Sequence, residues 1–173
     1  MLLEHRQAGE GVAHHAGHEV LTVAVDMHFG DRHLRNVVLR AWDGVAFGIY
    51  CQVSPPRPPP RWAQASMAFN GQQSVRDIGP ARDFYTRVLG WTPWFDARIG
   101  LTCNNMGVPL SQVATQQQDV IICASGQDAT GLWHYGQVEL VGWPGLGGHD
   151  FAARAVPPNL GVLALRIPVE DLD

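Results

Sequence analysis

The chain of 173 residues is 46% hydrophobic and 16% charged, and its formal net charge at pH 7 is −4. Such a composition is typical of a globular chain, either one domain with a core or two small modules, and it excludes intrinsic disorder. The mild negative charge argues against a nucleic-acid partner, and no apolar run is long enough to span a bilayer.

The N-terminal segment, residues 1–18, shows no secretory signal, so we expect a cytoplasmic protein with no membrane partner. The segment carries His14, His15 and His18. Imidazole nitrogens bind zinc, nickel or copper, and a helix would bring His14 and His18 onto one face. We favour a polar, flexible segment with incidental histidines, and a metal site is the alternative.

The next stretch, residues 19–53, predicts a partial β-rich module. Its β-branched run over 19–27 favours a strand. Residues 28–33 are polar and predict a loop. We therefore expect one strand before the clearest hairpin of the chain.

That hairpin has predicted strands at 35–42 and 45–53, on either side of Asp43-Gly44. An Asp-Gly pair between two apolar runs is typical of a type I′ turn. The proline-rich stretch 54–61 then predicts an extended linker between two modules.

A strand over 62–70 and an amphipathic helix over 75–91 open the second module. Asp77 is a suitable N-cap because its carboxylate accepts from the N–H groups of the first turn, where Pro80 also fits. Gly90 is suited to the left-handed conformation that ends a helix. The apolar face should pack on a sheet and consists of Ala81, Phe84, Tyr85, Val88 and Leu89.

The residues from Asp77 to Gly90 follow the pattern D-x-x-x-A-x-x-F-Y-x-x-x-L-G. This pattern resembles the first helix of the vicinal oxygen chelate superfamily, which includes glyoxalase I, extradiol dioxygenases, bleomycin-resistance proteins and methylmalonyl-CoA epimerases. The resemblance implies an α+β fold of βαβββ modules. Their strands form a curved, mostly antiparallel, cup-shaped sheet with the helix on its outer face. Because this fold supports several chemistries, the helix does not imply one activity.

Three strands after the helix complete a module over 62–143. We place them at 92–97, 119–125 and 132–143. The polar stretch 100–118 between the first two is long enough to cover a binding site.

Alternation along the last strand places Trp133, Tyr135, Gln137 and Glu139 on one face. If the opposite, apolar face packs on the helix, Glu139 points into the concave side of the sheet. An exposed strand carboxylate is the alternative interpretation of Glu139. His134 falls on the apolar face, where a packed core histidine is the favoured interpretation.

The last stretch, residues 144–173, predicts a connector and the first strand of a further module. Val169-Glu170-Asp171-Leu172 echoes Val75-Arg76-Asp77-Ile78 and indicates a weak internal repeat. Relative to the family, both ends of the chain are shortened. Unpaired sheet edges invite partners, so we expect a homodimer.

The family's four metal-ligand positions correspond, by the resemblance, to Gly48, Asn70, Glu139 and Ala164. Only Glu139 is a good ligand, and a catalytic ion usually needs about three protein ligands. Asn70 is better suited to a hydrogen bond with a substrate. No cofactor is therefore expected, and a divalent metal belongs to the enzyme alternative.

We favour a small-molecule-binding protein of the glyoxalase and bleomycin-resistance type. Tyr50, Trp133 and Tyr135 would stack on the ligand, and Glu139 would attract its charge. The alternative is a metal-dependent lyase, isomerase or dioxygenase that acts on a substrate with vicinal oxygens, with Glu139 as ligand or general base. A third reading is a decayed relative that only dimerises or binds weakly.

Overall fold

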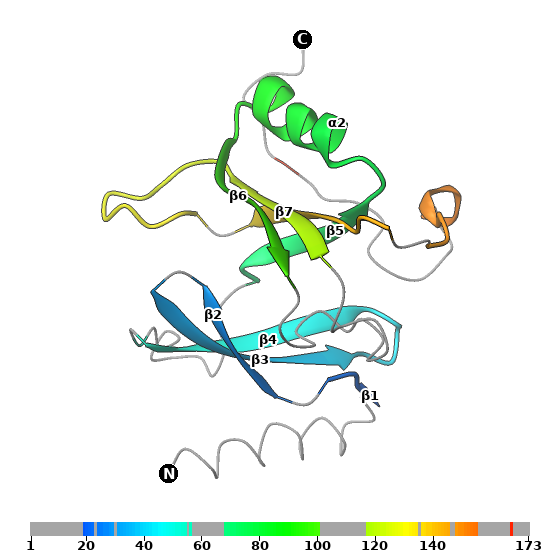
Figure 1. Ribbon diagram of the computed structural model, residues 1–173. Helices are drawn as coiled ribbons and strands as arrows, with labels where there is room; N and C mark the ends of the chain where they lie inside the picture. The colour runs from blue at the N-terminus through cyan, green and yellow to red at the C-terminus, as the bar shows by residue number, and fades with distance from the viewer. Residues whose placement is uncertain are drawn as a thin grey trace. The chain divides into compact units, whose positions relative to one another are not determined.

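The computed structural model describes residues 19–22, 24–29, 31–54, 56, 68–100, 117–134, 136–145, 148–155 and 167 (Figure 1). The chain divides into two compact units, one of residues 1–55, 105–107 and 147–173, the other of residues 56–104 and 108–146. The described part consists mostly of two open four-stranded sheets, together with one short helix. The protein is therefore of the α+β class, and each unit is described separately.

The sheet of the first unit is antiparallel throughout. Its strands are β1 (Glu19–Val20), β2 (Val25–Phe29), β3 (Arg32–Arg40) and β4 (Ala46–Ser54). Strand β3 lies in the centre: β1 and β2 follow each other along one side of it, and β4 lies along the other.

The single strand predicted over 19–27 is in fact two strands, because the chain bulges around Thr22. The amides of Leu21 and Thr22 both donate to the carbonyl of Val38, at 2.8 and 3.3 Å. The Thr22 hydroxyl in turn accepts from the Val38 amide at 2.9 Å. A side-chain oxygen thus replaces a ladder partner and interrupts the strand.

The loop predicted over 28–33 is also wrong, because β2 runs to Phe29 and β3 starts at Arg32. Only residues 30 and 31 separate the two strands, which pair in register from Phe29 opposite Arg32. A Gly-Asp pair between two strands is itself a hairpin signal, which the sequence analysis did not use.

The hairpin between β3 and β4 is confirmed, but its turn type is not the predicted one. A type I′ turn needs positive φ at both Asp43 and Gly44. Gly44 has φ +86°, whereas no non-glycine residue in the described ranges has a positive φ. The Gly44 amide donates to the Ala41 carbonyl, and the Ala41 amide donates to the Val45 carbonyl. The connection is therefore a longer turn in which glycine alone adopts the left-handed conformation.

The sheet of the second unit has the order β5-β8-β7-β6. Strands β5 and β8 are parallel, and the other two pairs are antiparallel. The strands are β5 (Asn70–Val75), β6 (Thr92–Gly100), β7 (Gln117–Ala124) and β8 (Gln137–Gly142). The helix comes between β5 and β6, so the element order is one strand, one helix and three strands (Figure 1).

Strand β5 is shifted from its prediction. It starts at Asn70 and ends at Val75, whereas a strand was expected over 62–70. Residues 61–67 lie outside the described residues. Asn70 is therefore the first residue of β5, opposite Gln137 at the start of β8.

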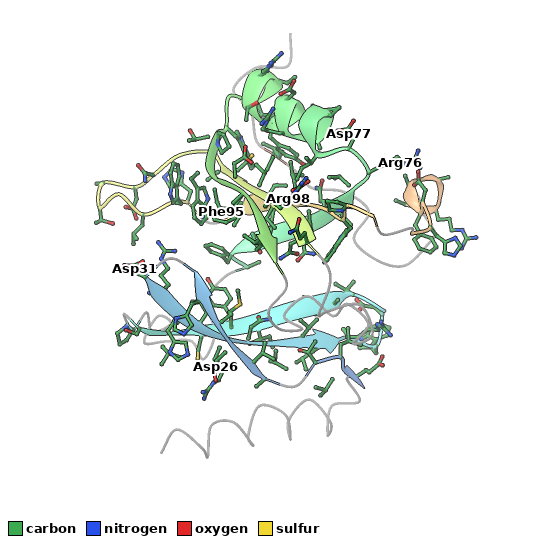
Figure 2. All side chains as sticks on the ribbon, viewed as in Figure 1. Asp26, Asp31, Arg76, Asp77, Phe95 and Arg98 are labelled. Carbon is green, nitrogen blue, oxygen red and sulfur yellow. The ribbon has the colours of Figure 1, made fainter. Side chains whose placement is uncertain are left out.

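The helix begins as predicted at Asp77, whose side chain accepts from the Gly79 amide at 3.1 Å. Figure 2 shows Asp77 at this start. The α-helical part, α2 (Ile78–Asp83), continues as a π-helical part, η1 (Phe84–Val88). Gly90 ends it with φ +68°. Both helix-end predictions are confirmed.

The apolar face of the helix is narrower than predicted. Tyr85 is buried in the core, and Ala81 and Leu89 pack against it. Phe84 and Val88 were expected on this face, but they are exposed at 49% and 69%. In the wider π-helical turn, residues four apart still lie on the same side of the helix. The buried face therefore consists of residues 81, 85 and 89, and it does not include Phe84 and Val88.

The core of the second unit lies between the helix and one face of the sheet. Its buried residues are Tyr85, Ile121, Cys123, Val138 and Leu140. Because side chains alternate along a strand, the neighbours of these residues point to the opposite face. Val120, Ile122 and Val141 on that second face are also buried. The central strands therefore have apolar side chains buried on both faces, which explains their continuous hydrophobic sequence.

The last described segment contains a short 3-10 turn, η2 (Ala152–Arg154). His14, His15, His18, Ala164 and the repeat at 169–172 lie outside the described residues, as do 57–61 of the predicted linker and 101–116 of the predicted covering loop. Among the described residues, no helix has the length and apolar character needed to cross a membrane.

Candidate functional site

The candidate site is formed where β5 and β8 begin, on the sheet face opposite the helix. Asn70 and Glu139 are 69 residues apart in sequence, and the Asn70 Nδ2 donates to Glu139 Oε2 at 2.6 Å. Parallel pairing explains this contact, since Asn70 lies opposite Gln137 and Gln72 lies opposite Glu139. Val138 and Leu140, on either side of Glu139, point into the helix-side core. The structure thus brings together two residues that the sequence analysis selected separately.

Glu139 is half-buried on β8. Burial raises the pKa of its carboxyl above the ordinary value, and the hydrogen bond from Asn70 lowers it only in part. Desolvation disfavours the charged form of a carboxyl unless a cation or several donors compensate. Within the described ranges, Asn70 is the one hydrogen-bond partner of the Glu139 side chain, and no ion pair includes that side chain. With respect to the described residues, the Glu139 carboxyl therefore has unused capacity to accept hydrogen bonds.

Gln137 supports this site from two residues earlier on β8. It is only 2% exposed, and its Oε1 accepts from Trp94 Nε1 at 2.9 Å. Its Nε2 donates to the carbonyl of His134 at 2.9 Å. The oxygen and the nitrogen of the Gln137 amide are thus both hydrogen-bonded. These bonds fix the side chain on the same sheet face as Glu139.

Trp94 reaches Gln137 because of an irregularity in β6. The pairing of β6 with β7 shifts register between Pro93 and Phe95, which leaves Trp94 as the extra residue. Its indole stacks on Trp133, with ring centroids 6.1 Å apart and an interplanar angle of 17°. Two half-buried indole rings therefore lie next to Gln137.

Strand β8 is shorter than predicted. It begins at Gln137, and Gly136 with φ +78° interrupts the extended chain before it. Trp133 instead forms an isolated bridge with Gln127. His134 was predicted in the apolar core, but it is exposed and its Nδ1 lies 3.4 Å from Ser125 Oγ. The alternation of side chains assumed from 133 to 139 therefore does not hold. Trp133 is connected to the site only by its stacking on Trp94, which in turn bonds Gln137.

Two predicted aromatic residues are not placed at this site. Tyr50 lies on β4 in the first unit, and the positions of the two units relative to one another are not determined. Tyr135 lies outside the described residues.

The described residues around Glu139 do not fit a metal ion. Asn70 turns its NH₂ group, which cannot ligate, toward the carboxylate. Gly48 provides no side chain, and no three His, Cys, Asp or Glu in the described ranges gather in a way that could hold an ion.

Neither Trp94 as a site residue nor the supporting role of Gln137 was predicted from the sequence. A signal for Trp94 was present, because Pro93 within a predicted strand is typical of a bulge, and a bulge redirects the next side chain. Gln137 was placed on the correct face, but its burial was not foreseen.

Comparison with known proteins found no family model and no curated protein that matches the chain.

Proposed function

We propose that the chain is a small-molecule-binding protein of the vicinal oxygen chelate type, with Glu139 and Asn70 as its ligand contacts. The order of one strand, one helix and three strands in the second unit supports this proposal. So does the placement of Glu139 on the sheet face opposite the helix.

The observation that carries the proposal is a partly desolvated carboxyl that has no countercharge in the part of the chain that the structure describes. Its only described partner is a neutral amide, at 2.6 Å. A ligand with a positive charge or several N–H donors would complete the hydrogen bonds of Glu139 and stabilise its charged form. Hydrogen bonds to charged groups contribute about 1.5–3 kcal/mol each, enough for measurable selectivity.

The Trp94–Trp133 pair supplies the apolar part of the site. Indole rings offer large, rigid contact surfaces, and their faces attract cations. A planar cation therefore matches both features, with its charge at Glu139 and its ring near the indoles.

Acid–base catalysis is a second candidate, and the raised pKa of Glu139 favours it. A general acid or base works best with a pKa near the working pH, and burial is a common way to raise that of a carboxyl. A lyase or isomerase of the superfamily would use Glu139 in this role. Asn70 would then position the carboxyl.

A matched pair of probes tests the binding proposal. Benzamidinium and benzamide have the same planar shape and differ in charge, so benzamidinium should bind at least about tenfold more tightly, as expected for one charged hydrogen bond. Binding is followed by tryptophan fluorescence or by NMR titration of the full chain. Glu139→Gln should abolish the difference between the probes.

Asp119→Asn provides the control, because Asp119 is a carboxyl of the same sheet on the helix side. It should leave the selectivity unchanged. Equal binding of the two probes by the wild-type chain would overturn the proposal, and so would selectivity that survives Glu139→Gln.

A further inference from the structure

The sheet face that carries Glu139 also holds a second acceptor without a partner. Gln118 lies near the start of β7 and is only 2% exposed. Its Oε1 is buried and accepts no hydrogen bond, and in the described ranges no other buried side-chain nitrogen or oxygen lacks a partner. An unsatisfied buried acceptor costs stability, so it calls for an explanation.

Alternation along β7 places Gln118 on the same face as Glu139. Ile121 belongs to the helix-side core, so Ile122 points to the other face, where it lies opposite Glu139. Gln118 is four residues before Ile122 on the same strand and therefore shares that face. At about 3.3 Å per residue, the two acceptors are about 13 Å apart along the strands.

The end of the face near Gln118 also offers an indole ring. Asp119 pairs with Gly142, so the next residue, Trp143, comes alongside Gln118. Trp143 is half-buried, and its Nε1 donates to Ser74 Oγ at 3.3 Å. Aromatic surface therefore lies beside Gln118, as it does beside Gln137 at the other end.

The β5 side of this face is open to solvent. Gln72 lies opposite Glu139, and Ser74 lies opposite Val141, so both side chains are on the Glu139 face. Both residues are exposed. A ligand can therefore approach the face from β5.

From these observations we infer that the ligand of the Glu139 site is elongated and carries a second N–H donor, which binds Gln118 Oε1. The inference rests on the proposed function, in which a planar cation binds Glu139. A donor at Gln118 would satisfy an oxygen that the chain leaves unpaired. The buried side chains between the two acceptors are apolar, which favours an aromatic connection between the two donor groups; they are Val120, Ile122 and Val141. A diaryl dication has this chemistry.

Gln137 shows that burial alone does not leave a glutamine unpaired on this face. Its exposure is also 2%, but its Oε1 accepts from Trp94 and its Nε2 donates to the His134 carbonyl. The unpaired oxygen is thus particular to Gln118. The two glutamines form a matched pair for experiment.

Calorimetric titration of the full chain with two probes tests the inference. Diminazene has two benzamidinium groups joined by a triazene bridge, and benzamidinium has one such group. Gln118→Met keeps a similar volume and removes the amide. It should weaken diminazene binding by about tenfold and leave benzamidinium binding unchanged. Asp119→Asn changes the next residue, on the helix side, and should leave both affinities unchanged.

Thermal unfolding of the same variants gives a second readout. Gln118→Met should raise the unfolding midpoint by about 2–4 °C, because it removes an unsatisfied buried oxygen. Gln137→Met is the control for stability and should lower the midpoint, because Trp94 Nε1 and the His134 carbonyl lose their partner. In the wild-type chain, diminazene should also shift the NMR signals of the Gln118 side-chain amide, and benzamidinium should not.

Three results would overturn the inference alone: diminazene binding that Gln118→Met leaves unchanged, a Gln118→Met variant less stable than the wild type, or Gln118 amide signals that diminazene does not shift. In each of these cases, a preference of the wild-type chain for benzamidinium over benzamide would still support the proposed function. Absence of that preference would overturn the proposed function and this inference together.

Discussion

Asp119 and Glu139 lie on neighbouring strands of one sheet and have opposite environments. Asp119 points to the helix side and forms a bidentate ion pair with Arg98, which is labelled in Figure 2. Arg98 Nε donates to Asp119 Oδ1 at 2.6 Å, and Arg98 Nη2 donates to Asp119 Oδ2 at 2.8 Å. This pair holds the pKa of Asp119 below the ordinary value. Glu139 points to the other side, has Asn70 as its described partner, and has a raised pKa.

The difference separates a structural carboxyl from a candidate functional one. Asp119 has its countercharge within the chain, so a ligand could add little. Glu139 is partly desolvated and has no countercharge among the described residues, an arrangement that costs stability and is typical of binding and catalytic sites.

The largest effect on stability is expected from Trp94→Phe, which removes support from the Glu139 side. Gln137 Oε1 would lose the indole donor at 2.9 Å and remain buried without it. Leaving a buried acceptor unsatisfied costs about 1–3 kcal/mol. Chemical denaturation measures the loss. Trp143→Phe is the control and should cost less, because its indole donates to the hydroxyl of the exposed Ser74 at 3.3 Å.

Glu139→Gln should change how stability depends on pH. Because the pKa of Glu139 is raised on folding, the folded state binds more protons than the unfolded state between the two pKa values, and wild-type stability falls as pH rises through that interval. The variant lacks this fall. The free energy of unfolding of the variant, relative to that of the wild type, should therefore increase as pH rises above about 4.5, the ordinary pKa of a glutamate side chain. A constant difference at all pH values would contradict the assignment.

Asn70→Ala isolates the contribution of the amide. The hydrogen bond from Asn70 lowers the pKa of Glu139, so its loss should raise that pKa further. Carboxyl-carbon NMR titration measures the change. Gln72→Ala, an exposed neighbour opposite Glu139 on β5, serves as the control and should leave the pKa unchanged.

Arg98→Gln should have the smallest effect and the opposite sign with pH. The lowered pKa of Asp119 contributes stability above the unfolded pKa, and that contribution disappears as pH falls through the folded pKa. The variant should be slightly less stable than the wild type at neutral pH, and the two should converge in acid. The effect is small because Arg98 is largely exposed and water screens the pair.

Local features of the fold could be predicted from the sequence because they depend on neighbouring residues. The Asp77 cap and the Gly90 stop follow from backbone chemistry within one helix, and both are confirmed. The bulge at Thr22 could not be predicted, since it depends on a hydrogen bond to Val38 on another strand. The break at Gly136 was missed because the alternating pattern continues across it.

The site was partly accessible to sequence reasoning. Asn70 and Glu139 were selected through the family resemblance, and the parallel pairing of β5 with β8 brings them into contact. No periodicity indicates which strands become neighbours when they are 69 residues apart. The Trp94–Gln137 bond depends on the same pairing together with a register shift, so it required the structure.

The most direct test of the account is the pKa of Glu139 itself, measured by NMR titration of the side-chain carboxyl carbons in the wild-type chain. We predict that Glu139 titrates above 4.5, and that Asp119 titrates below 3.8 in the same experiment. A Glu139 carboxyl that titrates at or below 4.5 would contradict the account, because it would show a solvated or fully compensated group with no need of a ligand.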